Sequence, residues 1–347
     1  MGDFNSRSAS IKVRARAVDM LGRQQIAGIP TALHELFKNA YDAFARRVEV
    51  DVLVKQRALV LRDNGYGMTE DDFRNRWLTL GTESKVGKAE VCAPWLGEFG
   101  KVPRRILGEK GIGRLAIAAI GPTLLVMTRS NKESQGFGEL VVCLIHWGLF
   151  EFPGVDLDRI RVPVVTLPGG QLPDKALMDS LVEDVIAGMD LLGDEITQAD
   201  RQRIAADLEL MRVSPTTIFS KLEGNEDRGD GSLSLEGDGF GTHFLVRPYD
   251  NVLDADLSNE SVGEVSRLRK LLVGFGNTML PAIQRPPIKG AFRVKHINGE
   301  SIDYIGDQEF FNPDEFLTAD HVFAGRFDEF GQFSGEVKVF DRAPVSY

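Results

Sequence analysis

The sequence predicts an α/β fold, because segments with helical periodicity alternate with segments of strand periodicity. Thr31 to Arg47 repeats apolar residues at helical spacing, whereas Val48 to Val54 alternates apolar and charged residues, like a strand with one solvated face. Gly108 to Ile120 is a glycine-rich turn that leads into an apolar helix. The predicted strands Leu124 to Thr128 and Glu139 to Trp147 follow it.

Length and composition indicate a globular protein of ordinary type. The 347 residues exceed the usual size of one domain, so two domains are expected. No apolar run approaches the roughly 18 residues of a membrane-spanning helix, and the polar residues 1–10 do not resemble a secretory signal. Cys92 and Cys143 form no metal-type pair. We therefore expect a cytoplasmic protein without a membrane partner.

The formal net charge of −10 argues against a broad nucleic-acid-binding surface, which needs clustered lysine and arginine. Two small basic clusters, Arg46-Arg47 and residues 101–105, are interpreted as solvated surface charge.

The remaining segments follow in chain order. Residues 1–20 are polar and basic and are expected to form an arm. Ala58 to Leu61 is a short strand, and Thr69 to Asp72 has the pattern of a capping box that opens a helix. Residues 81–107 form a long glycine-containing segment, and loops of that length within a domain are usually functional or disordered.

Longer helices are predicted in the second half of the chain. Residues 174–211 suggest two helices inserted before the strand Gly241 to Val246, and residues 261–280 suggest a third long helix.

Glu35, Asn39 and Asp42 lie on the polar side of the first predicted helix. A solvated stripe is the ordinary interpretation of such a pattern. The residue types favour chemistry instead, because a carboxylate suits a general base that polarises water. An amide oxygen one turn later suits Mg²⁺, which prefers oxygen ligands.

Asp63-Asn64-Gly65-Tyr66-Gly67-Met68 follows the second predicted strand. Asn-Gly after a strand usually marks a hairpin, but here it leads into the capped helix at Thr69. Asp63 can accept a hydrogen bond from the amino group of adenine, and Gly65 and Gly67 let the backbone approach the ligand. Guanine would present an acceptor oxygen to this carboxylate, so we expect ATP to bind about tenfold more tightly than GTP, or better.

Gly108-Glu109-Lys110-Gly111-Ile112-Gly113-Arg114-Leu115 places glycines before a helix, where backbone N–H groups and the helix dipole can bind a polyphosphate. The glycine spacing differs from the dinucleotide fingerprint. Arg114-Leu115 also replaces the Lys-Ser/Thr pair of a P-loop, so neither motif fits.

In this order, the three motifs resemble those of the GHKL ATPases: gyrase B, heat-shock chaperone ATPases, histidine kinases and MutL. The segment His34 to Ala43 is similar to the family's N-box, and the Asp63 and Gly108 segments are similar to its two glycine boxes. Gly241-Thr242 is similar to its late Thr motif. Thr79 to Lys85 resembles the segment that opens the lid in the chaperone, MORC and MutL branches.

The resemblance implies ATP and Mg²⁺ as ligands and gives single residues a role. Glu35 would be the catalytic base, Asn39 the Mg²⁺ ligand, and Asp63 the adenine reader, supported by Thr242 directly or through water. The other implied ATP-binding residues are Asp42, Gly65, Gly67, Met68, Lys85, Gly108, Lys110, Gly111, Ile112, Gly113 and Arg114.

The resemblance also implies a Bergerat-type α/β sandwich, a mixed sheet covered on one face by helices, with ATP beneath a lid at about residues 81–107. The arm would span residues 1–20, the ATP domain 21–250 with its helical insertion at 174–211, and a second, transducer-like α+β domain 251–347, in whole or in part. Relatives form dimers on ATP binding, which implies a homodimer here; the client, protein or nucleic acid, stays open. Relatives complete the site with a basic residue of the second domain, for which Arg285, Lys289 and Lys295 are the candidates.

Two other interpretations stay open. A histidine kinase shares the ATP fold but needs an upstream phosphoacceptor hairpin and lacks the water-activating carboxylate. A non-hydrolysing module would use ATP only to close a clamp, and Glu35 argues against it. The sequence does not choose between roles in DNA repair, chaperoning, chromatin and bacterial defence.

Overall fold

The computed structural model describes residues 12–80, 90–108, 113–132, 136–223, 231–258, 268, 288–305, 320–328, 330–340 and 342–346. The chain forms two compact units. The first comprises residues 1–275 and 287–306, and the second comprises residues 276–286 and 307–347.

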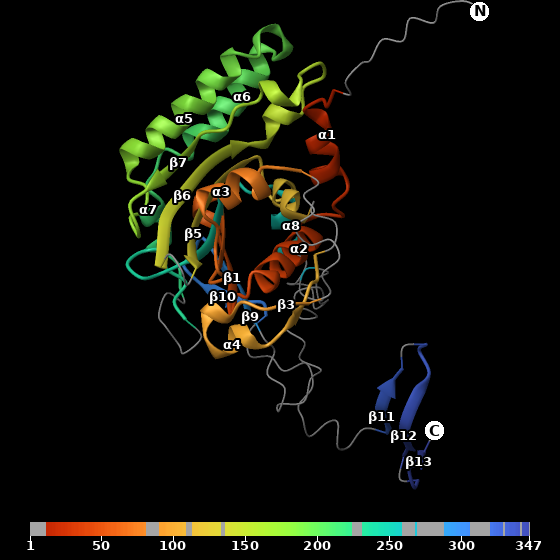
Figure 1. Ribbon diagram of the computed structural model, residues 1–347. Coiled ribbons are helices and arrows are strands. Elements are labelled where there is room, and N and C mark those ends of the chain that lie inside the picture. Colours follow the sequence, from red (N-terminus) through yellow and green to blue (C-terminus); the bar gives the residue numbers. More distant parts are fainter. Residues whose placement is uncertain are drawn as a thin grey trace, which may run out of the picture. The chain divides into compact units, whose positions relative to one another are not determined.

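An eight-stranded sheet organises the first unit, in the order β10–β9–β1–β2–β8–β5–β6–β7 (Figure 1). Its strands are β1 (Arg47–Leu53), β2 (Ala58–Asp63), β5 (Thr123–Lys132), β6 (Gly136–His146), β7 (Val164–Leu167), β8 (Gly241–Val246), β9 (Lys289–Lys295) and β10 (Ser301–Asp303). All neighbouring strands are antiparallel except β1 and β9, which pair in parallel. The mixed sheet confirms the predicted α/β fold class.

Helices cover one face of this sheet near Asp63. On that face, α2 (Ile29–Asp42) packs over β9, where a Cβ atom on Gly290 would lie 3.4 Å from the Phe37 ring. The π-helix η3 (Phe73–Trp77) packs over β8, with the rings of Trp77 and Phe244 stacked 6.4 Å apart.

The opposite face is covered as well, which the sequence did not predict. Figure 1 shows α5 (Lys175–Asp190) and α6 (Gln198–Glu209) along the outer side of β6 and β7. Behind β8, Phe219 of α7 (Pro215–Phe219) contacts His243 edge to face. Side chains alternate between the faces of a strand, so His243 points away from the face that carries Thr242 and Asp63. The prediction of one helix-covered face is therefore incomplete, because the inserted helices return to the sheet.

The other helical segments are short; those labelled η are 3₁₀ or π helices. They are α1 (Arg16–Asp19), η1 (Met20–Gln24), η2 (Val54–Gln56), α3 (Glu70–Asp72), η4 (Pro94–Leu96), α4 (Glu98–Lys101), η5 (Gly113–Ala119), η6 (Trp147–Phe150), η7 (Leu157–Arg159), η8 (Gly193–Glu195) and α8 (Val252–Ser258). A two-stranded sheet joins β3 (Glu90–Val91) to β4 (Arg104–Arg105).

Several local predictions are confirmed. The capping box at α3 is formed: the Thr69 hydroxyl accepts from the backbone N–H of Asp72, whose carboxylate accepts from the N–H of Thr69. The two inserted helices and β8 lie where the sequence predicted them. The first predicted helix is shorter than expected, because the chain ends α2 at Asp42 and turns into β1 through Phe44, which has a φ of 60°.

Part of the predicted arm packs against its own chain. Ala15 and Val18 are buried, and the backbone N–H of Ala15 donates to the carbonyl of Val155 at 2.9 Å. Residues 1–11 lie outside the described residues.

The second unit contains a three-stranded antiparallel sheet of β11 (His321–Phe327), β12 (Phe333–Val339) and β13 (Val345–Ser346). The helix predicted at 261–280 lies outside the described residues except Leu268. The transducer-like role of residues 251–347 stays a prediction. In the described part of the chain, no helix is long and apolar enough to cross a membrane.

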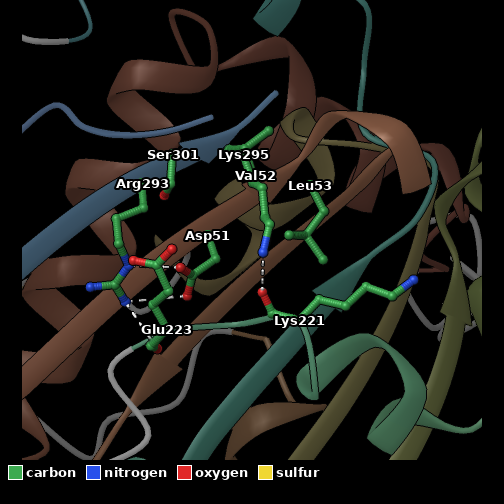
Figure 2. Close-up of a pocket in the computed structure, with 8 residues that line it drawn as sticks. All are labelled: Asp51, Val52, Leu53, Lys221, Glu223, Arg293, Lys295 and Ser301. Carbon is green, nitrogen blue, oxygen red and sulfur yellow. Dashed lines mark hydrogen bonds and ion pairs between the residues drawn. The ribbon is translucent and has the colours of Figure 1, made fainter. Parts of the chain in front are cut away.

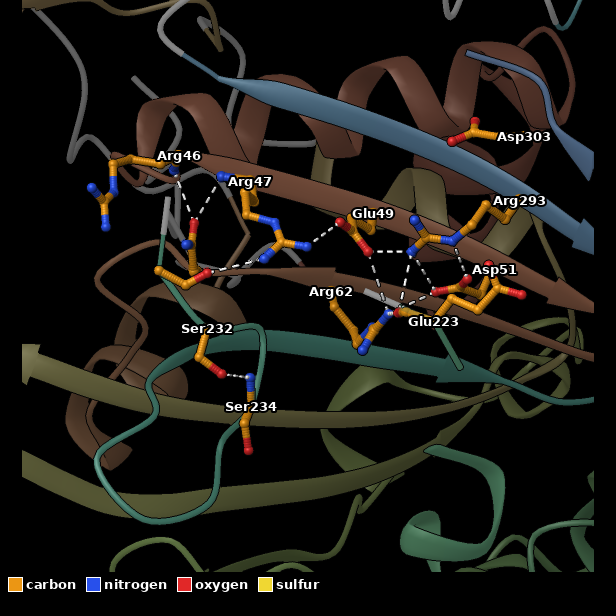
Figure 3. Close-up of polar contacts among 12 residues, drawn as sticks. Arg46, Arg47, Glu49, Asp51, Arg62, Glu223, Ser232, Ser234, Arg293 and Asp303 are labelled. Atoms are coloured by element: carbon orange, nitrogen blue, oxygen red, sulfur yellow. Dashed lines mark hydrogen bonds and ion pairs between the residues drawn. The ribbon is translucent and has the colours of Figure 1, made fainter. Parts of the chain in front are cut away.

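The prediction that β1 has a solvated face is wrong, since all seven of its residues are buried. Figure 3 shows why. The charged side chains of β1 meet arginines of β2 and β9: Arg62 lies 2.8 Å from Asp51, and the Arg293 Nε lies 2.8 Å from the same carboxylate. Arg47 pairs with Glu49 at 2.5 Å, and the carbonyl of Glu223 accepts from Arg62. Charge alternation here indicates a buried network of ion pairs.

Removing one cation from this network should destabilise the fold strongly. Arg62→Ala should lower the free energy of unfolding by about 3 kcal/mol, because it leaves a buried carboxylate undercompensated. Urea titration measures the change. Arg74→Ala is the matched control: its ion pair with Glu70 is about half exposed and should cost under about 1 kcal/mol. Equal losses in the two variants would mean that the network is not effectively desolvated.

Candidate functional site

The adenine-reading residue predicted from the sequence, Asp63, ends β2 in the middle of the sheet. Strand register places Asp63 opposite Thr242 of β8, and Thr242 opposite Thr128 of β5. The three residues therefore share one face, although 179 positions separate Asp63 from Thr242 (242 − 63). From the sequence, Thr128 is predicted only as the last residue of a strand. No local pattern marks it, because its role follows from the pairing of β5 with β8.

Thr128 connects the neighbouring motifs by hydrogen bonds. Its hydroxyl lies 3.0 Å from the Thr242 hydroxyl, accepts from the backbone N–H of Met68 at 3.0 Å, and donates to the carbonyl of Gly241 at 3.0 Å. Thr242 is thus held by Thr128 through its hydroxyl and faces Asp63 through its backbone. The predicted support of Asp63 by Thr242 therefore includes a main-chain hydrogen bond.

Asp63 is a buried carboxyl group with an unusual protonation equilibrium. Burial raises its pKa to about 7, and hydrogen bonds from the backbone N–H groups of Gly65 and Thr242 oppose this shift. The protonation state of Asp63 therefore changes near neutral pH, and a hydrogen-bond donor that approaches the carboxyl group would favour its charged form.

Two glycines allow neighbouring backbone segments to pack closely near Asp63. Gly67 has a φ of 64°, and a Cβ atom on it would lie 2.0 Å from the carbonyl oxygen of Arg129. Gly241 has a φ of 132°, and a Cβ atom on it would lie 2.1 Å from the carbonyl oxygen of Asp63. A side chain at either position would collide with the backbone, so both positions require glycine for a steric reason.

The polar side of α2 faces the end of the glycine-rich loop. Glu35 and Asn39 are half-buried on successive turns. A Cβ atom on Gly113 would lie 3.0 Å from the Glu35 Oε2, and the Lys38 ammonium lies 2.7 Å from the Glu35 Oε1. The predicted base and the last glycine of the predicted phosphate loop are therefore adjacent.

Asp42, one turn further along α2, contacts the beginning of the same loop. Its two carboxylate oxygens accept from the backbone N–H groups of Leu107, at 2.9 Å, and Gly108, at 3.0 Å. Asp42 thereby positions the loop, and direct contact between Asp42 and a nucleotide stays a prediction.

Arg114 follows the loop and reaches in the other direction. Its guanidinium donates to the carbonyls of Arg76 and Thr79, just before the predicted lid at residues 81–107. Burial lowers its pKa. Its predicted contact with phosphate stays a prediction, as do the roles of Gly65, Gly67 and Met68.

Some predicted site residues lie outside the described residues, namely Lys85, Lys110, Gly111, Ile112 and Arg285. Lys289 and Lys295 are the other candidates for a phosphate-binding cation. They lie on the same face of β9 as Arg293, which is the face away from α2. Figure 2 shows Lys295 in a pocket with Asp51 and Arg293, where its ammonium donates to the carbonyl of Lys221. Since Glu35 and Asp63 belong to the other face, this pocket is separate from the predicted site.

The donor set suits a magnesium ion bound mainly by its substrate. Within the described ranges, no three His, Cys, Asp or Glu side chains group as metal ligands. Mg²⁺ commonly takes one or two protein oxygens and completes its shell with phosphates and water. The Asn39 amide, half-buried beside Glu35, fits that requirement.

Comparisons with known proteins find similarity over part of this chain. The family model described as histidine kinase-, DNA gyrase B-, and HSP90-like ATPase matches residues 28–139. The chaperone protein HtpG of Idiomarina loihiensis is 31% identical over 117 residues, which cover 33% of this chain and 17% of the chaperone. The putative type II restriction enzyme HgiDII of Herpetosiphon aurantiacus is 31% identical over 144 residues, which cover 41% of this chain and 20% of that protein.

The chain spans about a fifth of the length of these relatives. A crystal structure of the N-terminal domain of a DNA repair protein aligns with 83% of this chain and 54% of its own, at 13% identity and a TM-score of 0.37. The resemblance to the MORC branch stays a prediction.

The raised pKa of Asp63 predicts a pH-dependent stability. Between about pH 4, where an unfolded aspartate ionises, and about pH 7, the folded protein retains the proton. The stabilisation is therefore fully present below pH 4 and is lost as the pH rises towards 7. Asp63→Asn removes this titration and keeps an acceptor for Gly65. Relative to this variant, the wild type without nucleotide should lose on the order of 3 kcal/mol of unfolding free energy between pH 4 and 8. If urea denaturation gave the same pH dependence of the unfolding free energy for the wild type and Asp63→Asn, the raised pKa would be refuted.

Proposed function

Because residues 28–139 match the model of the histidine kinase-, DNA gyrase B-, and HSP90-like ATPases, we propose that the chain binds and hydrolyses ATP with Mg²⁺. The observation that carries the proposal is the contact between Glu35 and Gly113, which brings a carboxylate to the end of the predicted phosphate loop. Asp63, at the end of β2, would read the adenine amino group.

Hydrolysis assigns each group a defined task. The Glu35 carboxylate would accept a proton from a water molecule, whose oxygen attacks the γ-phosphorus. The bond from that phosphorus to the bridging oxygen then breaks, giving ADP and phosphate. Mg²⁺, held by Asn39 and the phosphates, would offset their negative charge. Asp42 and Arg114 would fix the two ends of the loop.

The end of the segment from residue 90 to 107 contacts α2. Arg104 donates to the carbonyls of Tyr41 and Ala45, both at 3.0 Å, and its guanidinium lies 4.8 Å from the centre of the Phe44 ring. The end of this segment is therefore fixed to the end of α2. We propose that residues 81–107 close over bound ATP.

Glu35→Ala separates binding from hydrolysis. Affinity for ATP should stay within about threefold of wild type, while turnover should fall by roughly 10²–10⁴-fold, because general-base help is lost. Calorimetry and a phosphate-release assay measure the two quantities. Asn39→Ala should weaken both, and Glu70→Ala, on the exposed side of α3, should change neither. Wild-type turnover in Glu35→Ala would favour a module that uses ATP only to close a clamp.

ATP binding is also proposed to drive homodimerisation. Gly22 of η1 packs against η5, where a Cβ atom on it would lie 3.1 Å from the Leu115 carbonyl, so the N-terminal segment adjoins the helix that follows the phosphate loop. A nucleotide shifts association only through its preference for one state.

The dimer can be tested by light scattering. A non-hydrolysable ATP analogue with Mg²⁺ should raise the apparent mass towards twofold, and ADP should not. Deleting residues 2–11 should weaken this effect and leave the docked residues 12–24 in place. A constant monomer mass with every nucleotide would exclude dimerisation and leave the ATP site unaffected.

A further inference from the structure

Lys38 is a cation on the same side of α2 as the proposed catalytic base. Its ammonium lies 2.7 Å from the Glu35 Oε1, one helical turn earlier. The other oxygen of that carboxylate, Oε2, faces Gly113. Glu35 therefore lies between Lys38 and the end of the predicted phosphate loop.

The other described cations considered for this site have different contacts. Lys289 and Lys295 face away from α2, and Lys295 donates to the carbonyl of Lys221. The Arg114 guanidinium donates to two carbonyls that precede the lid segment. Lys38 is thus the candidate whose charge already adjoins the base.

The pair formed by Lys38 and Glu35 is easy to rearrange. Their side chains are 24% and 26% exposed, so water still reaches both partners and burial does not lock the pair. The lysine stem has four carbons and rotates freely, so the ammonium can exchange one anion for another close by.

The chemistry proposed for Glu35 brings such an anion close. A general base lies about 2.6–3.2 Å from the water that it activates, and that water lies about 3–3.5 Å from the atom under attack. The γ-phosphate must therefore approach the Glu35 carboxylate to which Lys38 is bonded. Two negative groups repel at this distance, and a cation between them offsets the repulsion.

Resting on the proposed function, we propose that Lys38 donates a hydrogen bond to the γ-phosphate of ATP, and so distinguishes ATP from ADP. The cation that completes the phosphate site then belongs to α2 itself. The contact requires the third phosphate, because Lys38 lies beside the base that acts there.

The proposal predicts a selective loss of affinity in Lys38→Met, which keeps the apolar stem and removes the charge. A non-hydrolysable ATP analogue with Mg²⁺ should bind about tenfold more weakly or worse, since a charge-assisted hydrogen bond is lost. ADP should stay within about twofold, because it lacks the third phosphate. Turnover should fall by roughly 10²-fold. Lys38→Arg should restore part of the discrimination.

The matched control is Lys55→Met, an exposed lysine of η2, which should change neither affinity. Unfolding midpoints of all variants verify that the fold is intact. Equal effects of Lys38→Met on ADP and on the analogue, or no effect, would refute the proposal. Faster turnover would also refute it, since Lys38 would then only restrain Glu35. If the wild type bound neither nucleotide, the proposed function itself would be wrong.

Discussion

The need to satisfy a buried carboxyl group at the centre of the sheet sets the geometry of this site. Asp63 ends β2 in a position from which water is excluded, so nearby backbone N–H groups must supply its hydrogen bonds. β8 provides one of these groups because it pairs with β2, and Thr128 of β5 holds β8 in turn. Gly67 and Gly241 are needed because the three strands approach so closely there.

Local chemistry made much of this predictable from the sequence. Helical spacing located α2, the capping box located α3, and the first glycine motif located the turn between β2 and α3. What escaped prediction depends on distant partners. Thr128 gained its role only from strand register. The charged side of β1 was mistaken for a solvated face because Arg293, which bonds Asp51 there, lies 242 residues further along the chain. The end of α2 at Asp42 was missed because Phe44 adopts a left-handed conformation that its sequence does not indicate.

The sheet separates two kinds of electrostatics. One face carries α2, with the half-buried Glu35, and the end of β2, where burial raises the pKa of Asp63. The other face neutralises its charges internally, with arginines of β2 and β9 bonded to acids of β1 (Figure 3). Such pairs are costly to desolvate and add little net stability. They do fix the register of β9 beside β1, because a slip by one residue would move Arg293 to the face of α2.

This register has a consequence for catalysis. Since Arg293, Lys289 and Lys295 share the face away from α2, β9 cannot bring its cations to Glu35 without losing its pairing with β1. Among the described residues, Lys38 of α2 is a cation that does adjoin Glu35. The residues on the polar side of α2 differ in burial. Asp42 is buried and accepts hydrogen bonds from Leu107 and Gly108. Glu35 and Lys38 are partly exposed and bonded to each other. The C-terminal end of α2 therefore positions the loop, whereas the middle of the helix presents the side chains proposed to contact ATP.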